Sequence, residues 1–221
     1  IESNKIISGS EKAIYLYYCR YDLKVLKNQI NIADNLTGID LSQCISSAGQ
    51  EGLVANNSIY AGDGLGTTLG ILLSSSTYQN IYNNSVHIST SYTYDKAFEV
   101  YYASSINVVN NIFAITSKNG GGVAYYAPNT STITTSNYNN LYTTGNYLAY
   151  WDAGNLKDLN ALKTASGKDV NSVSVHPGFF PDTNLHSASY WLDNKGTVLT
   201  QVSQDIDGDL RSLSTPDIGS D

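Results

Sequence analysis

Hydrophobic and polar residues alternate in short runs along most of this chain. The clearest example is the segment Lys96–Thr116, which reads K-A-F-E-V-Y-Y-A-S-S-I-N-V-V-N-N-I-F-A-I-T. It contains a run with Phe98, Val100 and Tyr102 on one parity, a polar bend, a second run, an Asn-Asn pair and a third run. Alternation with a period of two is typical of strands that have one buried face. The segment therefore predicts three short β-strands.

The same arrangement recurs at a nearly constant interval. The copies align on Asn28, Asn57, Asn84, Asn111 and Asn140, at steps of 29, 27, 27 and 29 residues. A fixed period in the twenties indicates a solenoid, in which every coil buries its apolar side against its neighbours. We therefore predict an all-β fold, a parallel β-helix of about five coils over residues 13–143. Residues 144–221 are expected to close the same single domain.

The recurring asparagines have a predicted structural role. Stacked coils bring equivalent side chains to a spacing of about 4.8 Å, at which side-chain amides can hydrogen-bond along the axis as a ladder. The ladder would contain Asn28, Asn57, Asn84, Asn111 and Asn140. The alternative is that they are only turn residues, because Asn also tolerates the left-handed backbone of a tight bend. Five copies in register favour the ladder.

The repeated motif resembles a known family. Gly70–Ile88 and Ala97–Ile115 share a small residue, alternating apolar positions, a small-Ser pair and V-x-N-N or its equivalent. This pattern resembles the right-handed parallel β-helix repeat of the pectate lyase-like superfamily, over about Ala13–Tyr142. The resemblance implies a right-handed solenoid. It does not imply an activity, because that superfamily includes lyases, hydrolases, adhesins and inert stalks.

After Tyr142 the repeat is expected to stop and a short helix to follow at Asn155–Ala165. The signals are leucines at a spacing of three, a capping box and a C-terminal glycine, namely Leu156, Leu159, Leu162, Asn155, Asp158 and Gly167. The later stretches V-S-V-H-P-G-F-F-P-D and D-I-D-G-D-L-R-S-L-S-T-P-D-I-G-S-D resemble the closing segment of secreted bacterial β-helix proteins. The resemblance implies a secreted or cell-surface protein. No capping helix precedes the first coil, so we expect the natural protein to continue upstream.

Composition narrows the possible partners. The formal net charge is −7, which argues against a nucleic acid or an anionic membrane held by a basic patch. No run approaches the roughly 20 apolar residues that a transmembrane helix needs. A monomer is expected.

Cys19 and Cys44 end the first strands of adjacent coils, where they could form a disulfide, but free buried thiols are favoured.

The outward face of the first strands is the candidate binding surface. Stacking would align Tyr15, Asp40, Leu72 and Glu99 in one file, and Tyr17, Ser42, Ser74 and Tyr101 in the next. Aromatic rings beside carboxylates suit a sugar chain, whose ring faces stack while its hydroxyls bond to acids. The predicted carbohydrate-binding residues are Tyr15, Tyr17, Asp40, Glu99 and Tyr101. The alternative is that tyrosines are simply good residues for an exposed strand.

Insertions after the third strands are expected to form a variable rim beside a ligand. They are Ala61–Thr68, Ser89–Asp95 and Ser117–Gly122. Tolerated surface loops are an equally simple interpretation.

No catalytic residues are predicted. Asp40 and Glu99 would lie two coils apart, about 9.6 Å by strand spacing, near the upper limit for an inverting glycosidase, but Leu72 would separate them. The paired Asp-Asp and Gly-His-Gly-like motifs of the hydrolases do not occur, nor does a basic residue beside the Ca²⁺-binding acids of the lyases. We therefore expect a polysaccharide-associated module without catalysis in this segment. The alternatives are a fragment of a polysaccharide lyase or glycoside hydrolase, and an adhesin or structural stalk.

Asp205, Asp207 and Asp209 in D-I-D-G-D are the candidate metal ligands. Alternating acids around a glycine can surround Ca²⁺, although the spacing is not that of an EF-hand. A structural turn, braced by Arg211, is the favoured interpretation, and no other cofactor is predicted. The sequence assigns no role to its three histidines, His87, His176 and His186.

Overall fold

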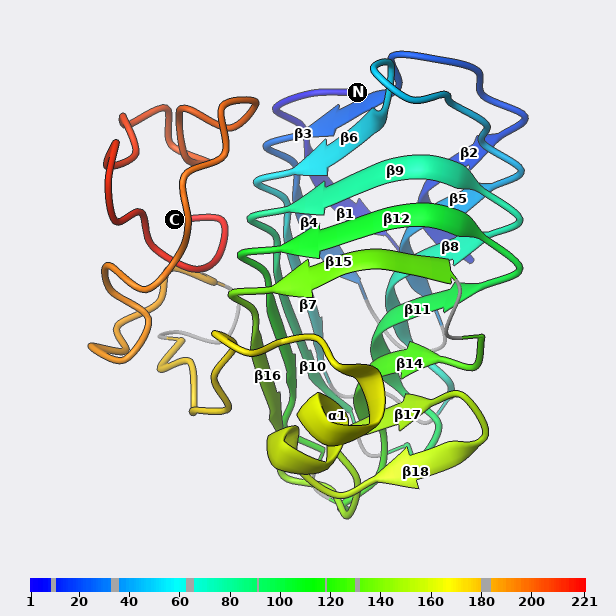
Figure 1. The fold of residues 1–221 in the computed structure, drawn as a ribbon, viewed down its shortest axis with the longest axis vertical. Helices are drawn as coiled ribbons and strands as arrows, with labels where there is room; N and C mark the ends of the chain where they lie inside the picture. The colour runs from blue at the N-terminus through cyan, green and yellow to red at the C-terminus, as the bar shows by residue number, and fades with distance from the viewer. Residues whose placement is uncertain are drawn as a thin grey trace.

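The computed structural model describes residues 1–8, 11–32, 36–62, 66–90, 92–117, 119–129, 132–179 and 184–221. Within these ranges the chain forms a parallel β-solenoid of about five turns, with a single short helix near its C-terminal end (Figure 1). The predicted fold class is confirmed.

Each full turn contributes one strand to each of three sheets, and strands of successive turns pair in parallel. Sheet 1 holds the first strands: β2 (Lys12–Tyr17), β5 (Thr37–Ser42), β8 (Leu69–Ser74), β11 (Lys96–Tyr101), β14 (Val123–Ala127), β17 (Ala149–Trp151) and β18 (Gly154–Leu156). Sheet 2 holds the second strands: β3 (Lys24–Leu26), β6 (Gly52–Ala55), β9 (Thr77–Tyr82), β12 (Ser104–Val109) and β15 (Ile133–Asn137). Sheet 3 holds the third strands: β1 (Lys5–Ser8), β4 (Gln29–Ile32), β7 (Ser58–Gly62), β10 (Ser85–Ser89), β13 (Ile112–Ile115) and β16 (Asn140–Thr143).

The solenoid extends further than the sequence predicts. The repeat is expected to stop after Tyr142, but β17 pairs in parallel with β14 and adds another rung to sheet 1. The antiparallel pair of β17 and β18 then ends this sheet with a hairpin. At the other end β1 pairs with β4, so the first residues occupy a third-strand position.

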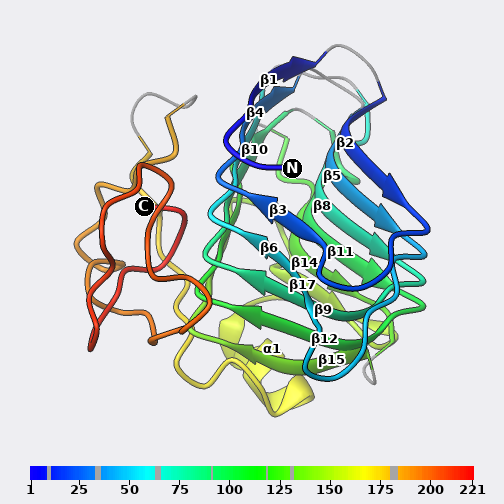
Figure 2. The same cartoon turned by 90° about the horizontal axis from the view of Figure 1, so that it is seen from above.

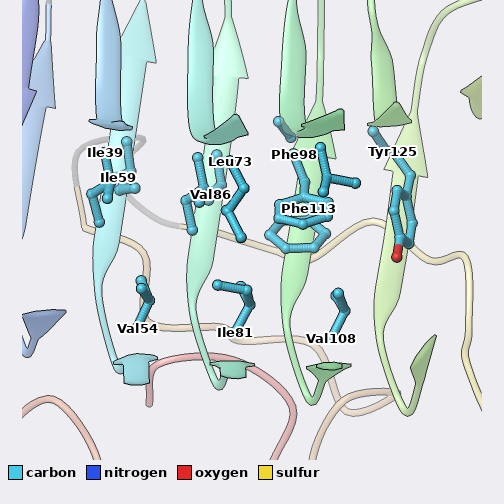
Figure 3. Close-up of a cluster of buried hydrophobic side chains, with 14 of the residues drawn as sticks. Ile39, Val54, Ile59, Leu73, Ile81, Val86, Phe98, Val108, Phe113 and Tyr125 are labelled. Carbon is cyan, nitrogen blue, oxygen red and sulfur yellow. The ribbon is translucent and has the colours of Figure 1, made fainter. Parts of the chain in front are cut away.

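The hydrophobic core fills the inside of the solenoid. In sheet 1 the register stacks Ile39, Ile71, Phe98 and Tyr125, all fully buried. Side chains of this size each contribute roughly 1.5–3 kcal/mol when removed from water. Figure 3 shows buried residues from all three sheets meeting in the interior of three successive turns. The labelled sets are Ile39, Val54 and Ile59, then Leu73, Ile81 and Val86, then Phe98, Val108 and Phe113.

The two residues of each Asn pair have different roles. The residue before each ladder position adopts a left-handed backbone, which turns the chain between sheets 2 and 3. These residues are Lys27, Asn56, Asn83, Asn110 and Tyr138, with φ between 50° and 60°. The sequence pattern suggests the ladder bond and the left-handed bend for the same Asn, whereas in the structure two successive residues provide them. The first residue bends the chain and the second points its amide into the interior.

The predicted buried Asn ladder is present. Each Nδ2 donates to the Oδ1 of the next Asn along the axis, at 2.9 to 3.1 Å, through Asn4, Asn28, Asn57, Asn84, Asn111 and Asn139. All the amides donate in the same direction. The last donor, Asn139, bonds at 3.2 Å to the buried carboxylate of Asp169. A carboxylate only accepts hydrogen bonds, so it suits the donor end of the ladder.

Asn140 is not a member of the ladder, and that part of the prediction is wrong. Asn140 lies opposite Ile112 in the pairing of β13 with β16, which leaves Asn139 opposite Asn111. The last step is therefore 28 residues. Asn140 instead exchanges two hydrogen bonds of 3.0 Å with the main chain of Val175.

The helix is shorter than predicted. Helix α1 spans Leu159–Ser166, with Asp158 as N-cap and Gly167 in a left-handed C-cap. Asp158 accepts the main-chain N–H of Ala161 at 2.9 Å. Asn155, predicted to start the helix, lies instead in β18, where its backbone pairs with Tyr150 of β17 in the antiparallel hairpin. Leu162 is buried against the core at the end of the solenoid, so the predicted C-terminal cap is present.

Residues 173–179 and 184–221, together called the closing segment below, lie along the outside of sheets 2 and 3 (Figures 1 and 2). The first residues of three Asn pairs hold this segment. Asn56 donates to the carbonyl of Gln204 at 2.6 Å, Asn83 to Gly219 at 3.2 Å, and Asn110 to Thr197 at 2.7 Å. Apolar contacts accompany these bonds, as where Phe179, Leu185, Leu192 and Ile218 pack on Ile112 and Ala114 of sheet 3.

Candidate functional site

The outer face of sheet 1 carries the predicted binding residues, and their register is as expected. Tyr15 pairs with Asp40, Asp40 with Leu72, and Leu72 with Glu99. The same file then continues through Tyr126 and Tyr150. The second file runs through Tyr17, Ser42, Ser74 and Tyr101. The face therefore has aromatic residues at both ends and acids between them.

Asp40 is buried although it points outward. Lys12 folds over it, with Nζ 2.5 Å from Oδ2, and Ser42 donates to Oδ1 at 2.7 Å. The ammonium of Lys12 also lies 3.8 Å from the centre of the Tyr15 ring. Burial alone would lower the pKa of Lys12, but the hydrogen bond and charge of Asp40 raise it above its ordinary value. Asp40 is thus a paired, mostly covered carboxylate, which limits direct contact with a ligand.

Glu99 has a similar partner. Lys96, three residues earlier on β11, places Nζ 2.7 Å from Glu99 Oε1 and 4.1 Å from the centre of the Tyr126 ring. The carboxylate of Glu99 is mostly covered, while Lys96 remains about one-fifth exposed. Lysine, acid and aromatic ring therefore form one contiguous group across β11 and β14.

A groove of about 490 Å³ opens beside this group. Tyr126 and Tyr150 line it and stack on each other, with ring centres 4.8 Å apart and planes inclined by 18°. The remaining lining includes Tyr94, Tyr147, Lys96 and the asparagines Asn119, Asn146 and Asn155. The groove thus combines aromatic side chains with amide and ammonium groups that can hydrogen-bond. Such a mixture suits a ligand with apolar faces and many hydroxyls.

The predicted rim loops supply part of this groove. Thr93, Tyr94 and Asp95 come from the insertion after β10, and Asn119–Gly122 from the insertion after β13. Residues 63–65 of the earliest insertion, and residues 91 and 118 of the two later ones, lie outside the described residues.

Tyr126 and Tyr150 are the important residues that sequence reasoning missed. They lie on β14 and β17, where the predicted repeat contains no first strand. A signal is present in V-A-Y-Y-A at 123–127, where alternation puts Tyr125 inside and Tyr126 outside. Extending the coil pattern to this run would have placed Tyr126 next to Glu99 in the same outward file of sheet 1.

Tyr15, Tyr17 and Tyr101 lie away from the groove lining. Tyr15 and Tyr17 are about half exposed, and their rings stack at 6.1 Å at the N-terminal end of sheet 1. Tyr101 contacts the exposed ring of Tyr102 at 5.5 Å. The structure therefore separates the five predicted binding residues into an N-terminal aromatic group and the neighbourhood of Glu99.

The acids of D-I-D-G-D have different environments. Asp205 Oδ1 accepts the main-chain N–H groups of Asp207, Gly208 and Asp209, each at 2.9 Å, which braces a tight turn. Asp207 points instead to His186, with Oδ2 2.6 Å from Nε2. Arg211 donates to Asn56 Oδ1 and to the Gly219 carbonyl, both at 2.9 Å. The predicted structural turn is therefore present, but Asp205 braces it, whereas the hydrogen bonds of the Arg211 side chain go to residues outside the turn.

Both cysteines are free thiols. Cys44 is buried, and its sulfur contacts the carbonyl of Leu16 at 3.4 Å. Burial raises the pKa of the Cys44 thiol to about 11, so it stays protonated and inert at neutral pH. Cys19 is partly exposed.

Comparison with protein-family models, curated proteins and solved structures gives no match to this chain. Among the described residues, no helix has the length and apolar character needed to cross a membrane.

Proposed function

We propose that this chain is a carbohydrate-binding β-helix module that acts without catalysis, and that its glycan binds in the groove on sheet 1. The observation that carries the proposal is the pair of stacked tyrosines, Tyr126 and Tyr150, in the lining of that groove. We also propose that the module is secreted or attached to a bacterial surface and related to the pectate lyase-like superfamily. The motif V-x-N-N, the closing segment and the low content of charged residues support this part of the proposal.

The groove has the chemistry that a sugar chain requires. The two rings stack on each other and Lys96 lies over Tyr126, so the pair presents apolar ring edges and hydroxyl groups to the groove, against which a sugar chain can pack. Lys96 and the side-chain amides of Asn146 and Asn155 line the same groove and can bond to hydroxyl groups. Burial raises the pKa of Tyr126, and neighbouring Tyr150 and Glu99 add to this effect. Its phenol therefore remains a neutral donor well above neutral pH.

The geometry of the acids favours binding over hydrolysis. Asp40 and Glu99 are separated by Leu72 in the file. Each acid is engaged by a lysine, Lys12 or Lys96. A general acid and base must reach opposite sides of one glycosidic bond, whereas these carboxylates are fixed on separate rungs. The charges of Asp40 and Glu99 are thus neutralised by the two lysines, and the acids contribute to the surface without acting as catalysts.

Affinity measurements on a panel of soluble polysaccharides test the proposal. Tyr126→Ala and Tyr150→Ala should each weaken binding by roughly 2- to 13-fold, because an aromatic contact contributes about 0.5–1.5 kcal/mol beyond area burial. Tyr190→Ala is the matched control, since this exposed tyrosine lies on the closing segment and should leave affinity unchanged. Tyr17→Ala tests the N-terminal aromatic group in the same way.

Three results would count against this function. Binding that survives both groove substitutions but is lost in Tyr17→Ala would move the site to the other end of sheet 1. Release of reducing or unsaturated ends from any bound polysaccharide would favour the lyase or hydrolase alternative. No binding to any member of the panel would favour the adhesin or stalk alternative.

A further inference from the structure

Three potential ligand atoms from distant parts of the closing segment converge beside the D-I-D-G-D turn. His186 Nε2 lies 2.6 Å from Asp207 Oδ2 and 3.7 Å from Asp221 Oδ1. One ligand atom from each of these residues lies within 4.8 Å of the others. The side chains are 39%, 47% and 40% exposed, so solvent also reaches the cluster.

A neighbouring amide fixes the tautomer of His186. Asn184 Oδ1 contacts the ring nitrogen Nδ1, and the same oxygen accepts the main-chain N–H of His186 at 3.1 Å. The second bond identifies that atom as the oxygen of the amide, which only accepts hydrogen bonds. Nδ1 therefore carries the ring proton, and in a neutral imidazole Nε2 presents its lone pair to the acids. Metal-binding histidines use this arrangement, with the other nitrogen donating to an oxygen outside the ligand shell.

The arrangement requires a positive species in the cluster. A neutral Nε2 and the Asp207 carboxylate are both acceptors, and they face one another at 2.6 Å. Either a second proton on the ring fits this separation, or a bound cation is accommodated when the two groups move slightly apart. The imidazolium proton can hydrogen-bond to only one of the two acids, whereas a metal ion can be bound by Nε2 and by both carboxylates. We propose that His186, Asp207 and Asp221 bind a first-row divalent metal ion such as Zn²⁺.

The ligand set determines the class of metal. Ca²⁺ and Mg²⁺ take oxygen ligands, while one imidazole nitrogen with two carboxylates suits Zn²⁺ and similar ions. Tetrahedral Zn²⁺ with bonds of about 2.0–2.1 Å needs ligand atoms roughly 3.3 Å apart. The separations of His186 Nε2 from Asp207 Oδ2 and Asp221 Oδ1, 2.6 and 3.7 Å, lie on either side of that value, so small side-chain movements would bring the three ligands to a common ion. Exposure leaves room for water as the fourth ligand.

The surrounding structure supports such a site. Asp205 braces the turn that carries Asp207 through its three main-chain bonds. Asn184 and His186 also line a cleft of about 410 Å³ between the closing segment and strands β1 and β4, which gives an ion access. The metal would join three points of a segment that has no helix and only isolated β-bridges over residues 184–221. Its role would be to fix the fold of the closing segment itself, independently of the glycan groove.

Zn²⁺ titration by calorimetry, on the full chain freed of metal with a chelator at pH 7.5, tests this inference. We expect one Zn²⁺ per chain and a rise in melting temperature on binding, because an ion that binds only the folded state stabilises it. His186→Gln and Asp207→Asn should each lower the affinity at least about tenfold. Asn184→Ala, which leaves the ligands in place, should lower it by roughly 10- to 100-fold, as positioning residues do.

His176→Gln is the matched control, because His176 lies on the same segment outside the cluster and should leave Zn²⁺ affinity unchanged. Circular dichroism without metal verifies that each variant folds. Absence of Zn²⁺ binding by the wild-type chain would leave a simple imidazolium–carboxylate pair and overturn the proposal. Equal affinity in wild type and His186→Gln would do the same, as would Ca²⁺ binding as tightly as Zn²⁺.

Discussion

Replacing Asn111 with alanine removes an amide from the middle of the buried ladder. The Nδ2 group of Asn111 donates to the carbonyls of Ile81 and Val109 at 2.8 and 3.1 Å, and to Asn139 Oδ1 at 3.1 Å. Its Oδ1 accepts both the main-chain and the side-chain N–H of Asn84, each at 3.0 Å. One substitution therefore deletes five hydrogen bonds in a region without solvent exposure.

The expected loss in the free energy of unfolding depends on which hydrogen-bond partners of Asn111 are left without another bond. The main-chain N–H of Asn84 would be left buried without its acceptor, at roughly 1–3 kcal/mol. The side-chain amide of Asn84 keeps its bonds to Val54 and Tyr82, so losing its ladder bond costs about 0.5–1.5 kcal/mol. Together these give about 2–4 kcal/mol. For a chain of this length that lowers Tm by about 4–16 °C.

Thermal unfolding followed by circular dichroism measures this loss, and Asn107→Ala provides the control. Asn107 also makes an amide–amide bond, to Asn80 at 2.9 Å, but it is half-buried on the outer side of sheet 2. Water can replace its partner, so its Tm should change far less. An unchanged Tm for Asn111→Ala would refute a stabilising ladder. Equal losses in both variants would show that burial does not set the cost.

Two further predictions concern ionisation and reactivity. Because Asp40 raises the pKa of Lys12 above 10.5, the pair stabilises the fold below that pH and the contribution is lost as the pH rises through the folded-state pKa. The difference in Tm between wild type and Asp40→Asn should therefore be steady from neutral pH to about pH 10 and narrow above it; a difference that persists unchanged at pH 12 would contradict the pairing. At pH 8 a thiol reagent should modify only Cys19 in the folded chain, since Cys44 is buried with a pKa of about 11. Rapid modification of two thiols before unfolding would show that Cys44 is accessible.

The repeat could be predicted because every coil contains the same local signals. Alternating runs such as Phe98–Tyr101 and the recurring Asn indicate which residues face inward, and each coil packs only on its neighbours. The prediction that Tyr102 shares the inward parity of Phe98 and Val100 is wrong: Tyr102 is 76% exposed, because β11 ends at Tyr101 and the left-handed backbone of Tyr102 turns the chain. Where the period changes, prediction fails. Asn139 and Asn140 are adjacent amides, and only the pairing of β16 with β13 shows that Asn139 lies above Asn111. A local sequence pattern does not contain that register.

The candidate site was predictable only in part. The file of Tyr15, Asp40 and Glu99 follows from the coil period and is present. The burial of the two acids does not follow, because it depends on how Lys12 and Lys96 fold back over the sheet. The cluster at His186 depends on the path of an irregular segment. Chain positions 186, 207 and 221 have no periodic relation that a sequence pattern could reveal.

The closing segment restricts the number of coils in the solenoid, because it is hydrogen-bonded to Asn56, Asn83 and Asn110. Its carbonyls contact the bend residues of three successive turns, which stand about 4.8 Å apart along the axis. A duplicated coil inserted between Asn56 and Asn110 would continue the ladder but move one anchor by a full rung. Coils added on the N-terminal side of Asn56 would leave these three anchors aligned, whereas a coil added after Asn110 would move the attachment of Val175 to Asn140 by a rung. Changes in coil number should therefore be tolerated on the N-terminal side of Asn56 and opposed between Asn56 and Asn140.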